Sequence, residues 1–239
     1  INNQNGAATD SGTLETYTDA DGSHYRLAGL GMGTDGLTYT NTENVTIHMG
    51  AGDDQFAVDA IDPVTSVTLN LGNGNDHVDV TAMEGNLTIN GGAGDDTVTA
   101  GSLAPVLTGG MMAGVAGALS FSGDAGSDTL NIDDTAVSSG SQAVLTGSTL
   151  SGLGMGLGVT SYTIDTLNIR LGDYDDLVEV QGTSAATHIW GNGGDDVFDV
   201  SSDGASLAGT LDNVLGLLDI DAGAGGNTLS VSDLGDTDA

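Results

Sequence analysis

The sequence predicts an all-β protein: a right-handed parallel β-solenoid (a β-roll or β-helix) with coils of about 20 residues that turn at segments rich in Gly and Asp. Three observations predict this fold. Val, Ile and Leu occur in short runs that alternate with polar residues, which is the periodicity of strands. Gly accounts for 40 of 239 residues, whereas Pro accounts for only 2. A ten-residue pattern that joins a turn to a strand recurs along the chain.

Alternating strands precede the turns. Their segments are VTIHM (45–49), VTLNL (67–71), LTING (87–91), LSFSG (119–123) and LNIRL (167–171). In the first segment Val45, Ile47 and Met49 face one side, and Thr46 and His48 face the other. We therefore expect stacked coils to form one internal ladder of Ile47, Leu69, Ile89, Phe121, Ile169, Ile189 and Ile220.

The turn pattern occurs seven times. The copies are MGAGDDQFAV (49–58), LGNGNDHVDV (71–80), GGAGDDTVTA (91–100), GDAGSDTLNI (123–132), LGDYDDLVEV (171–180), GNGGDDVFDV (191–200) and AGAGGNTLSV (222–231). The fourth position is Gly in every copy except the one with Tyr174, and the eighth is always large and apolar. The sixth position is Asp in six copies and Asn227 in the last. Glycine permits the positive φ values that such bends require.

The pattern G-G-x-G-x-D-x-U-x, with U apolar, resembles the calcium-binding nonapeptide of RTX (repeats-in-toxin) proteins over roughly residues 45–231. The resemblance implies that the sixth-position aspartates carry most of the Ca²⁺ binding, assisted by fifth-position residues and turn glycines. The candidate metal ligands are therefore Asp54, Asp76, Asp96, Asp128, Asp176, Asp196, Asp53, Asn75, Asp95, Asp175, Asp195, Gly52, Gly74, Gly94 and Gly194. It also implies export by Gram-negative bacteria and folding outside the cell, where Ca²⁺ is abundant.

The charge of the chain also points to cations as partners. The formal net charge is −32, and Arg26 and Arg170 are the only Lys or Arg residues, which excludes binding to nucleic acid or to an anionic membrane surface. Stacked strands lie about 4.8 Å apart. Two carboxylates about 5 Å apart repel by about 3 kcal/mol at an effective dielectric near 20. Oxygen ligands without nitrogen or sulfur select Ca²⁺ or Mg²⁺, and Ca²⁺ tolerates irregular coordination, so several Ca²⁺ ions are the expected cofactors.

The sequence also excludes two kinds of structural feature. The chain has no Cys, which excludes disulfides and thiolate metal sites. The uncharged stretch 97–123 is too rich in Gly for a membrane helix, so no membrane insertion is expected.

A longer repeat is superimposed on the turns. LAGLGMG (27–33) matches LSGLGMG (150–156), and SDTLNIDD (127–134) matches GNTLSVSD (226–233). We expect a first solenoid unit over 1–127, preceded by a short N-terminal segment, and a second unit over 128–226. Residues 227–239 then open a third unit or complete the first coil of a neighbouring molecule.

These features predict a calcium-stabilised structural module without enzymatic activity, belonging to an extracellular bacterial fibre, adhesin or surface layer. An end coil exposes apolar ladders and strand edges, so the module is expected to assemble end to end or to adjoin further repeats. The alternative is an RTX-type secretion and folding module attached to a toxin or hydrolase.

Three other functions are less favoured. A β-helix enzyme acting on polysaccharide needs a base and cationic groups. The sequence offers no residue to which a catalytic role can be assigned and contains no nucleophile elbow. Trp190 could stack on a sugar, but carbohydrate binding has no further support. An outward ladder of Thr46, Thr68 and Thr88 would suit ice or a surface, but it ends at Ser120.

Overall fold

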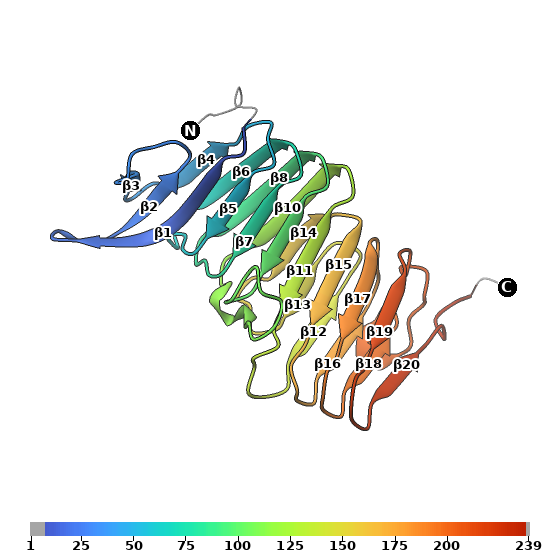
Figure 1. The fold of residues 1–239 in the computed structure, drawn as a ribbon. Coiled ribbons are helices and arrows are strands. Elements are labelled where there is room, and N and C mark those ends of the chain that lie inside the picture. The colour runs from blue at the N-terminus through green and yellow to red at the C-terminus, as the bar shows by residue number, and fades with distance from the viewer. Residues whose placement is uncertain (1–7, 238–239) are drawn as a thin grey trace.

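The computed structural model describes residues 8–237, and it is an all-β protein built from two long sheets of ten strands each (Figure 1). Sheet A contains, in spatial order, β20 (Thr228–Val231), β18 (Val197–Val200), β16 (Leu177–Val180), β12 (Gln142–Leu145), β13 (Leu150–Gly152), β14 (Val159–Thr163), β10 (Leu119–Ala125), β8 (Asn86–Ala93), β6 (Ser66–Asn73) and β4 (Asn44–His48). Sheet B contains β19 (Leu218–Asp221), β17 (Ala186–Trp190), β15 (Thr166–Arg170), β11 (Thr129–Asp133), β9 (Thr97–Ala100), β7 (His77–Val80), β5 (Gln55–Val58), β1 (Ser11–Asp19), β2 (Gly22–Gly29) and β3 (Leu37–Tyr39). Two short 3₁₀ segments are η1 (Met112–Gly114) and η2 (Gly204–Ser206).

Most strands pair in parallel with strands that are one circuit away along the chain. Alternate residues point between the sheets, as in β6, where Val67, Leu69 and Leu71 are each at most 1% exposed. The core is one cluster of such side chains that includes residues on both sides of position 127, such as Phe121 and Leu130. The parallel strands and the two long sheets agree with the predicted all-β class and are compatible with a β-solenoid.

Two antiparallel meanders interrupt the parallel stacking. One is β1–β2–β3 in sheet B, and the other is β12–β13–β14 in sheet A. Their backbones match: the Leu30 N–H donates to Ser11 O over 2.7 Å, and the Leu153 N–H donates to Gln142 O over 2.9 Å. Leu30 and Leu153 both have φ of 52°. The LAGLGMG and LSGLGMG segments are thus the same structural element in two copies.

The second meander makes the chain exchange sheets. Before it, the strand that enters each motif turn lies in sheet A (β4, β6, β8, β10); after it, that strand lies in sheet B (β15, β17, β19). The expectation of one internal ladder is therefore wrong. Phe121 is opposite Tyr162 and Ile89 in sheet A, whereas Ile169 is opposite Ile132 and Ile189 in sheet B. Two ladders face each other across the core.

No helix among residues 8–237 is long and apolar enough to cross a membrane.

Candidate functional site

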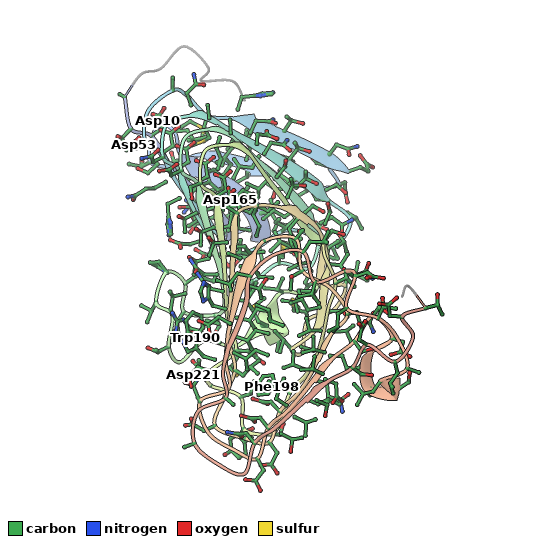
Figure 2. The ribbon with its side chains drawn as sticks, turned by 90° about the vertical axis from the view of Figure 1, so that its right-hand side faces the viewer. Asp10, Asp53, Asp165, Trp190, Phe198 and Asp221 are labelled. Carbon is green, nitrogen blue, oxygen red and sulfur yellow. The ribbon has the colours of Figure 1, made fainter. Side chains whose placement is uncertain are left out.

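The motif turns lie on two opposite edges of the double sheet. On both sides of the second meander, β10, β14, β12 and β16 run in the same direction. A turn that leaves β10 and a turn that enters β16 are therefore at opposite ends of the strands. Figure 2 shows Asp53, from the first set of turns, near one end of the molecule, and Asp221, beside the last turn, toward the other. The sixth-position residues form a first buried column (Asp54, Asp76, Asp96, Asp128) and a second column in which Asp176 and Asp196 are buried and Asn227 is half-buried.

Hydrogen bonds from backbone N–H groups to carboxylates hold each buried column together. The Asp54 N–H donates to Asp76 Oδ1 over 2.7 Å, and the Asp76 N–H donates to Asp96 Oδ1 over 2.9 Å. The Asp176 N–H donates to Asp196 Oδ1 over 2.9 Å in the same way. Each carboxylate thus accepts from the preceding coil, and every aspartate of the columns is at most 2% exposed.

The second oxygen of several of these carboxylates lacks a partner. Among the described residues, the Oδ2 atoms of Asp76, Asp96, Asp176 and Asp196 are buried and accept no hydrogen bond. Asn227 shows what this position faces: its Oδ1 accepts from the Asp196 N–H, and its Nδ2 donates to Ala222 O over 2.9 Å. At this position an amide makes both contacts, one as acceptor and one as donor. An ionised carboxylate would instead place its second oxygen where Asn227 has Nδ2, facing a carbonyl oxygen to which it cannot donate.

Burial has the expected electrostatic consequence. Desolvation by burial raises the pKa of Asp76 to about 6, against the lowering effect of the Asp54 N–H, and neighbouring Asp54 and Asp53 raise it further. Burial likewise raises the pKa of Asp96 to about 7 and that of Asp176 to about 6. The columns therefore hold carboxylates that are hard to ionise unless something positive neutralises them.

The fifth-position side chains also form hydrogen-bonded ladders, but each one accepts from the N–H of the following coil, not from that of the preceding coil. Asp53 Oδ1 accepts from the Asn75 N–H, Asn75 Oδ1 from the Asp95 N–H, and Asp95 Oδ1 from the Ser127 N–H, each over 2.8 Å. Asp175 and Asp195 continue the arrangement on the second edge. These side chains are exposed, so the predicted ligands divide into a buried set and an exposed set.

The turn glycines allow the coils to stack closely. Gly94 has φ of +129°, and a Cβ built on it would lie 2.0 Å from Gly74 O. Asp124 and Asn192 occupy the second position with φ of 70° and 63°, a conformation that Asp and Asn tolerate better than other side chains. Gly74 and Gly194 also have positive φ, whereas Gly52 does not, so the first turn has a different bend.

Neither arginine contacts the columns. Arg26 donates to Glu15, with Nε at 3.0 Å from Oε1, and its guanidinium lies 4.3 Å from the centre of the Tyr17 ring. The Arg170 guanidinium lies 4.1 Å from the centre of the Trp190 ring. Trp190 is thus covered on one ring face by a side chain of its own sheet. Within residues 8–237, no group of three or more His, Cys, Asp or Glu side chains is placed to hold a metal ion.

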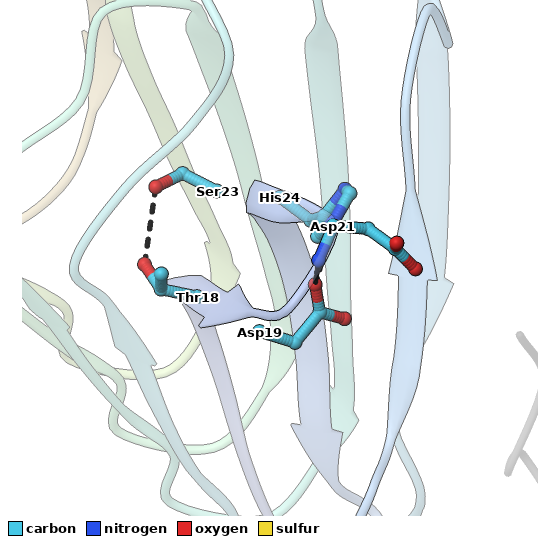
Figure 3. Close-up of polar contacts among 5 residues, drawn as sticks. All are labelled: Thr18, Asp19, Asp21, Ser23 and His24. Carbon is cyan, nitrogen blue, oxygen red and sulfur yellow. Dashed lines mark hydrogen bonds and ion pairs between the residues drawn. The ribbon is translucent and has the colours of Figure 1, made fainter.

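A Ser, His and Asp do come close in sequence at the β1–β2 hairpin. His24 Nε2 lies 3.2 Å from Asp19 Oδ1, and the Ser23 hydroxyl lies 3.0 Å from Thr18 Oγ1. Figure 3 shows that these two pairs lie on opposite sides of the hairpin. These residues do not converge into a catalytic triad.

Sequence reasoning missed three structural aspartates. Asp133 and Asp134 are fully buried and accept from the N–H groups of Gly110 and Met112, which fixes the long segment before β10. Asp165 accepts from the Asp128 N–H over 2.9 Å and so ends the first buried column at the second meander. The signal for Asp134 was present, because Asp233 occupies the same position in the matching GNTLSVSD segment.

No protein-family model matches the chain, and neither a curated protein nor a solved structure matches it. The resemblance to RTX proteins therefore stands on the seven motif copies.

Proposed function

We propose that the protein is a calcium-stabilised structural module, a right-handed β-solenoid of an extracellular bacterial fibre, adhesin or surface layer, that assembles end to end. The observation that carries the proposal is the pair of carboxylate columns, in which the buried Oδ2 atoms of Asp76, Asp96, Asp176 and Asp196 have no partner among the described residues.

A buried ionised carboxylate without a partner costs several kcal/mol. The two columns repeat that cost at Asp76, Asp96, Asp176 and Asp196, and neither arginine offsets it. A cation supplied from outside would lower the cost at every coil, because stacking brings the carboxylates of adjacent coils close together. Oxygen ligands alone favour Ca²⁺ over transition metals.

The donor set fits a loosely held ion rather than a closed cage. No three acidic or histidine side chains converge within the described residues, and Oδ1 of each column aspartate already accepts an N–H. Position-four carbonyls such as Gly74 O are directed at the next coil's glycine. Oδ2 atoms of the buried columns, with first-position carbonyl oxygens such as Ala222 O, are the groups that would hold Ca²⁺. Bound there, Ca²⁺ would supply positive charge and no chemistry.

A structural role also agrees with the rest of the molecule. Most hydrogen bonds of the described residues serve to stack one coil on the next, and His24, His77 and His188 each pair with an aspartate. The extracellular bacterial setting comes from the RTX resemblance. An RTX-type secretion and folding module is the alternative, and it would share the same cation columns.

The test is circular dichroism and calorimetric titration of the purified chain at pH 7 in EDTA, in millimolar Ca²⁺ and in equal Mg²⁺. We expect Ca²⁺ to raise the β signal and the denaturation midpoint, with affinity in the weak extracellular range of roughly 10⁻⁴ to 10⁻³ M. The matched control is the triple variant Asp76→Asn, Asp96→Asn, Asp176→Asn, which should lose most of the response to Ca²⁺. A wild-type chain whose midpoint is identical in EDTA and in Ca²⁺ would refute the calcium role.

A further inference from the structure

The C-terminal end of the double sheet is an open apolar surface. Leu229 and Val231 of β20 are each 58% exposed. They line a hollow of about 470 Å³ together with Val200, Leu211, Val214, Leu218 and Ile220. An apolar hollow rimmed by strand edges is the kind of surface at which a further strand pair can dock.

The molecule contains a covered copy of this same surface. Leu130 and Ile132 occupy the positions in TLNI that Leu229 and Val231 occupy in TLSV, yet both are 0% exposed. They are covered because β15 pairs with β11 in parallel, and β14 pairs with β10. Leu130 lies opposite Leu167 in this junction. The internal junction thus shows what covers an end of this type.

The N-terminal end carries the matching half of the junction. β3 is the last strand of the first meander and β4 follows it, as β14 is the last strand of the second meander and β15 follows it. Within the described residues, β3 and β4 are the terminal strands of sheets B and A. Their local geometry agrees: a Cβ on Gly36 would meet Leu27 O at 2.4 Å, and one on Gly158 would meet Leu150 O at 2.6 Å. Leu37 of β3 is 48% exposed, whereas Val159, its counterpart, is 1% exposed.

The sheets are also in the right order for the two ends to meet. Each meander adds its strands to one sheet, first to B and then to A, so both sheets finish with ten strands. β19 and β3 are then in sheet B, and β20 and β4 are in sheet A. This repeats the internal arrangement, in which β10 and β14 share one sheet and β11 and β15 share the other.

We propose that the C-terminal end of one chain docks onto the N-terminal end of a second copy, with β20 pairing in parallel with β4 and β19 with β3. The internal register sets Leu229 opposite Val45 of the second copy and Val231 opposite Ile47. This inference rests on the proposed structural function and names its partner. The contact is heterologous, so each added copy presents a new open end and the product is a filament.

Charge modulates this docking. Two copies that each carry a net charge of −32 repel one another, and salt screens that repulsion. At the internal junction Asp128 meets Asp165; the corresponding pair between copies is Asn227 and Glu43, which removes one negative charge from the contact. We therefore expect association to strengthen from low to moderate NaCl.

The test is analytical ultracentrifugation and light scattering of the full chain over a range of concentrations. One variant carries Leu229→Asp and Val231→Asp, a second carries Leu37→Asp, and the control carries Leu103→Asp at a residue 51% exposed but away from both ends. All four positions are already exposed, so the variants should fold, and circular dichroism checks this. The wild type and the control should form concentration-dependent oligomers, whereas each end variant alone should associate at least about tenfold more weakly.

Mixing the two end variants makes the test decisive. The first variant keeps an intact N-terminal end and the second keeps an intact C-terminal end, so the mixture should form a dimer with one molecule of each. A folded wild type that stays monomeric, a mixture that stays monomeric, or a Leu37→Asp variant that dimerises alone through its C-terminal end would each overturn the proposal. Every sample is run in Ca²⁺ and in EDTA. Association of a chain whose denaturation midpoint is the same in EDTA and in Ca²⁺ would remove the calcium role but keep the docking, and a chain that Ca²⁺ stabilises but that stays monomeric would do the reverse.

Discussion

The fifth and sixth residues of each motif turn are adjacent in the chain, and in most turns both are aspartates. Both accept a backbone N–H from a neighbouring coil at nearly the same distance, as Asp95 does from Ser127 and Asp96 does from Asp76. They differ in surroundings: the fifth-position side chains are exposed, and the sixth-position aspartates are buried. Their electrostatic consequences differ accordingly, because burial raises the pKa of Asp96 to about 7.

The comparison separates the mechanical role of these aspartates from their electrostatic one. One carboxylate oxygen is enough to hold adjacent coils in register, in water or in the core. The second oxygen costs little in solvent, but in the core it needs a proton, a cation or replacement by an amide. The chain contains an amide in each set, Asn75 at an exposed fifth position and the half-buried Asn227 at a sixth position.

The largest expected difference between the two sets is in pH dependence without calcium. The folded pKa values of Asp76, Asp96 and Asp176 are about 6, 7 and 6, above the ordinary value of 3.8. The folded state therefore binds more protons than the unfolded state between pH 4 and pH 7. Stability in EDTA is highest at the acid end and falls as pH rises through this window, by several kcal/mol at about 1.4 kcal/mol per unit of pKa.

Urea denaturation midpoints at several pH values measure this slope. The triple variant Asp76→Asn, Asp96→Asn, Asp176→Asn should flatten it. The control Asp53→Asn, Asp95→Asn, Asp175→Asn removes the same number of charges from the exposed set and should keep the slope. Equal slopes in the two triple variants would show that the buried column is not the source of the pH dependence.

The sequence predicts some of these features and not others. The alternation of Val67, Leu69 and Leu71 identifies inward positions because side chains in a strand have a period of two in any sheet. The same period says nothing about which of two sheets a strand joins. The exchange of sheets at residues 142–163, and with it the division into two edges, therefore could not be read from the pattern.

The site was predictable in part for a related reason. The repeated Asp-Asp pair marks the residues that line the turns, but burial depends on which side of the bend each side chain faces. Asn227 was the sequence signal for the structural role of the sixth position, because an amide there still accepts the N–H of Asp196. Asp165 could not be found, because it lies outside any motif copy and meets Asp128 only through the second meander.

A smaller difference is expected on truncation in the presence of Ca²⁺. Asp96→Ala leaves the Asp76 N–H buried without an acceptor and removes a cation ligand, which should lower the free energy of unfolding by about 2–3 kcal/mol. Asp95→Ala leaves the Ser127 N–H to water and should lower it by about 0.5 kcal/mol. Urea denaturation in millimolar Ca²⁺ measures both changes in the free energy of unfolding. Equal decreases would mean that burial does not distinguish the two sets.

A change of opposite sign is expected from an amide. Asp196→Asn keeps the acceptor for the Asp176 N–H and supplies a donor, as Asn227 does toward Ala222 O. At pH 7 in EDTA this should raise the free energy of unfolding by about 1 kcal/mol, the contribution of one hydrogen bond. In saturating Ca²⁺ the gain should disappear because a ligand is lost. A gain of the same size in both conditions would indicate that no ion is held at Asp196.

The smallest expected effect is that of Asp95→Asn. The amide oxygen still accepts the Ser127 N–H, and the amide nitrogen is solvated, as Asn75 shows one coil earlier. What remains is the loss of one exposed negative charge from a chain with net charge −32, a change of a few tenths of a kcal/mol that salt screens. Asp212→Asn removes an exposed charge outside the motif turns and is the matched control, so both variants should show the same small, salt-dependent gain in urea denaturation. A larger gain for Asp95→Asn, or one that Ca²⁺ abolishes, would mean that the exposed set shares in cation binding, and the division between the two sets would have to be redrawn.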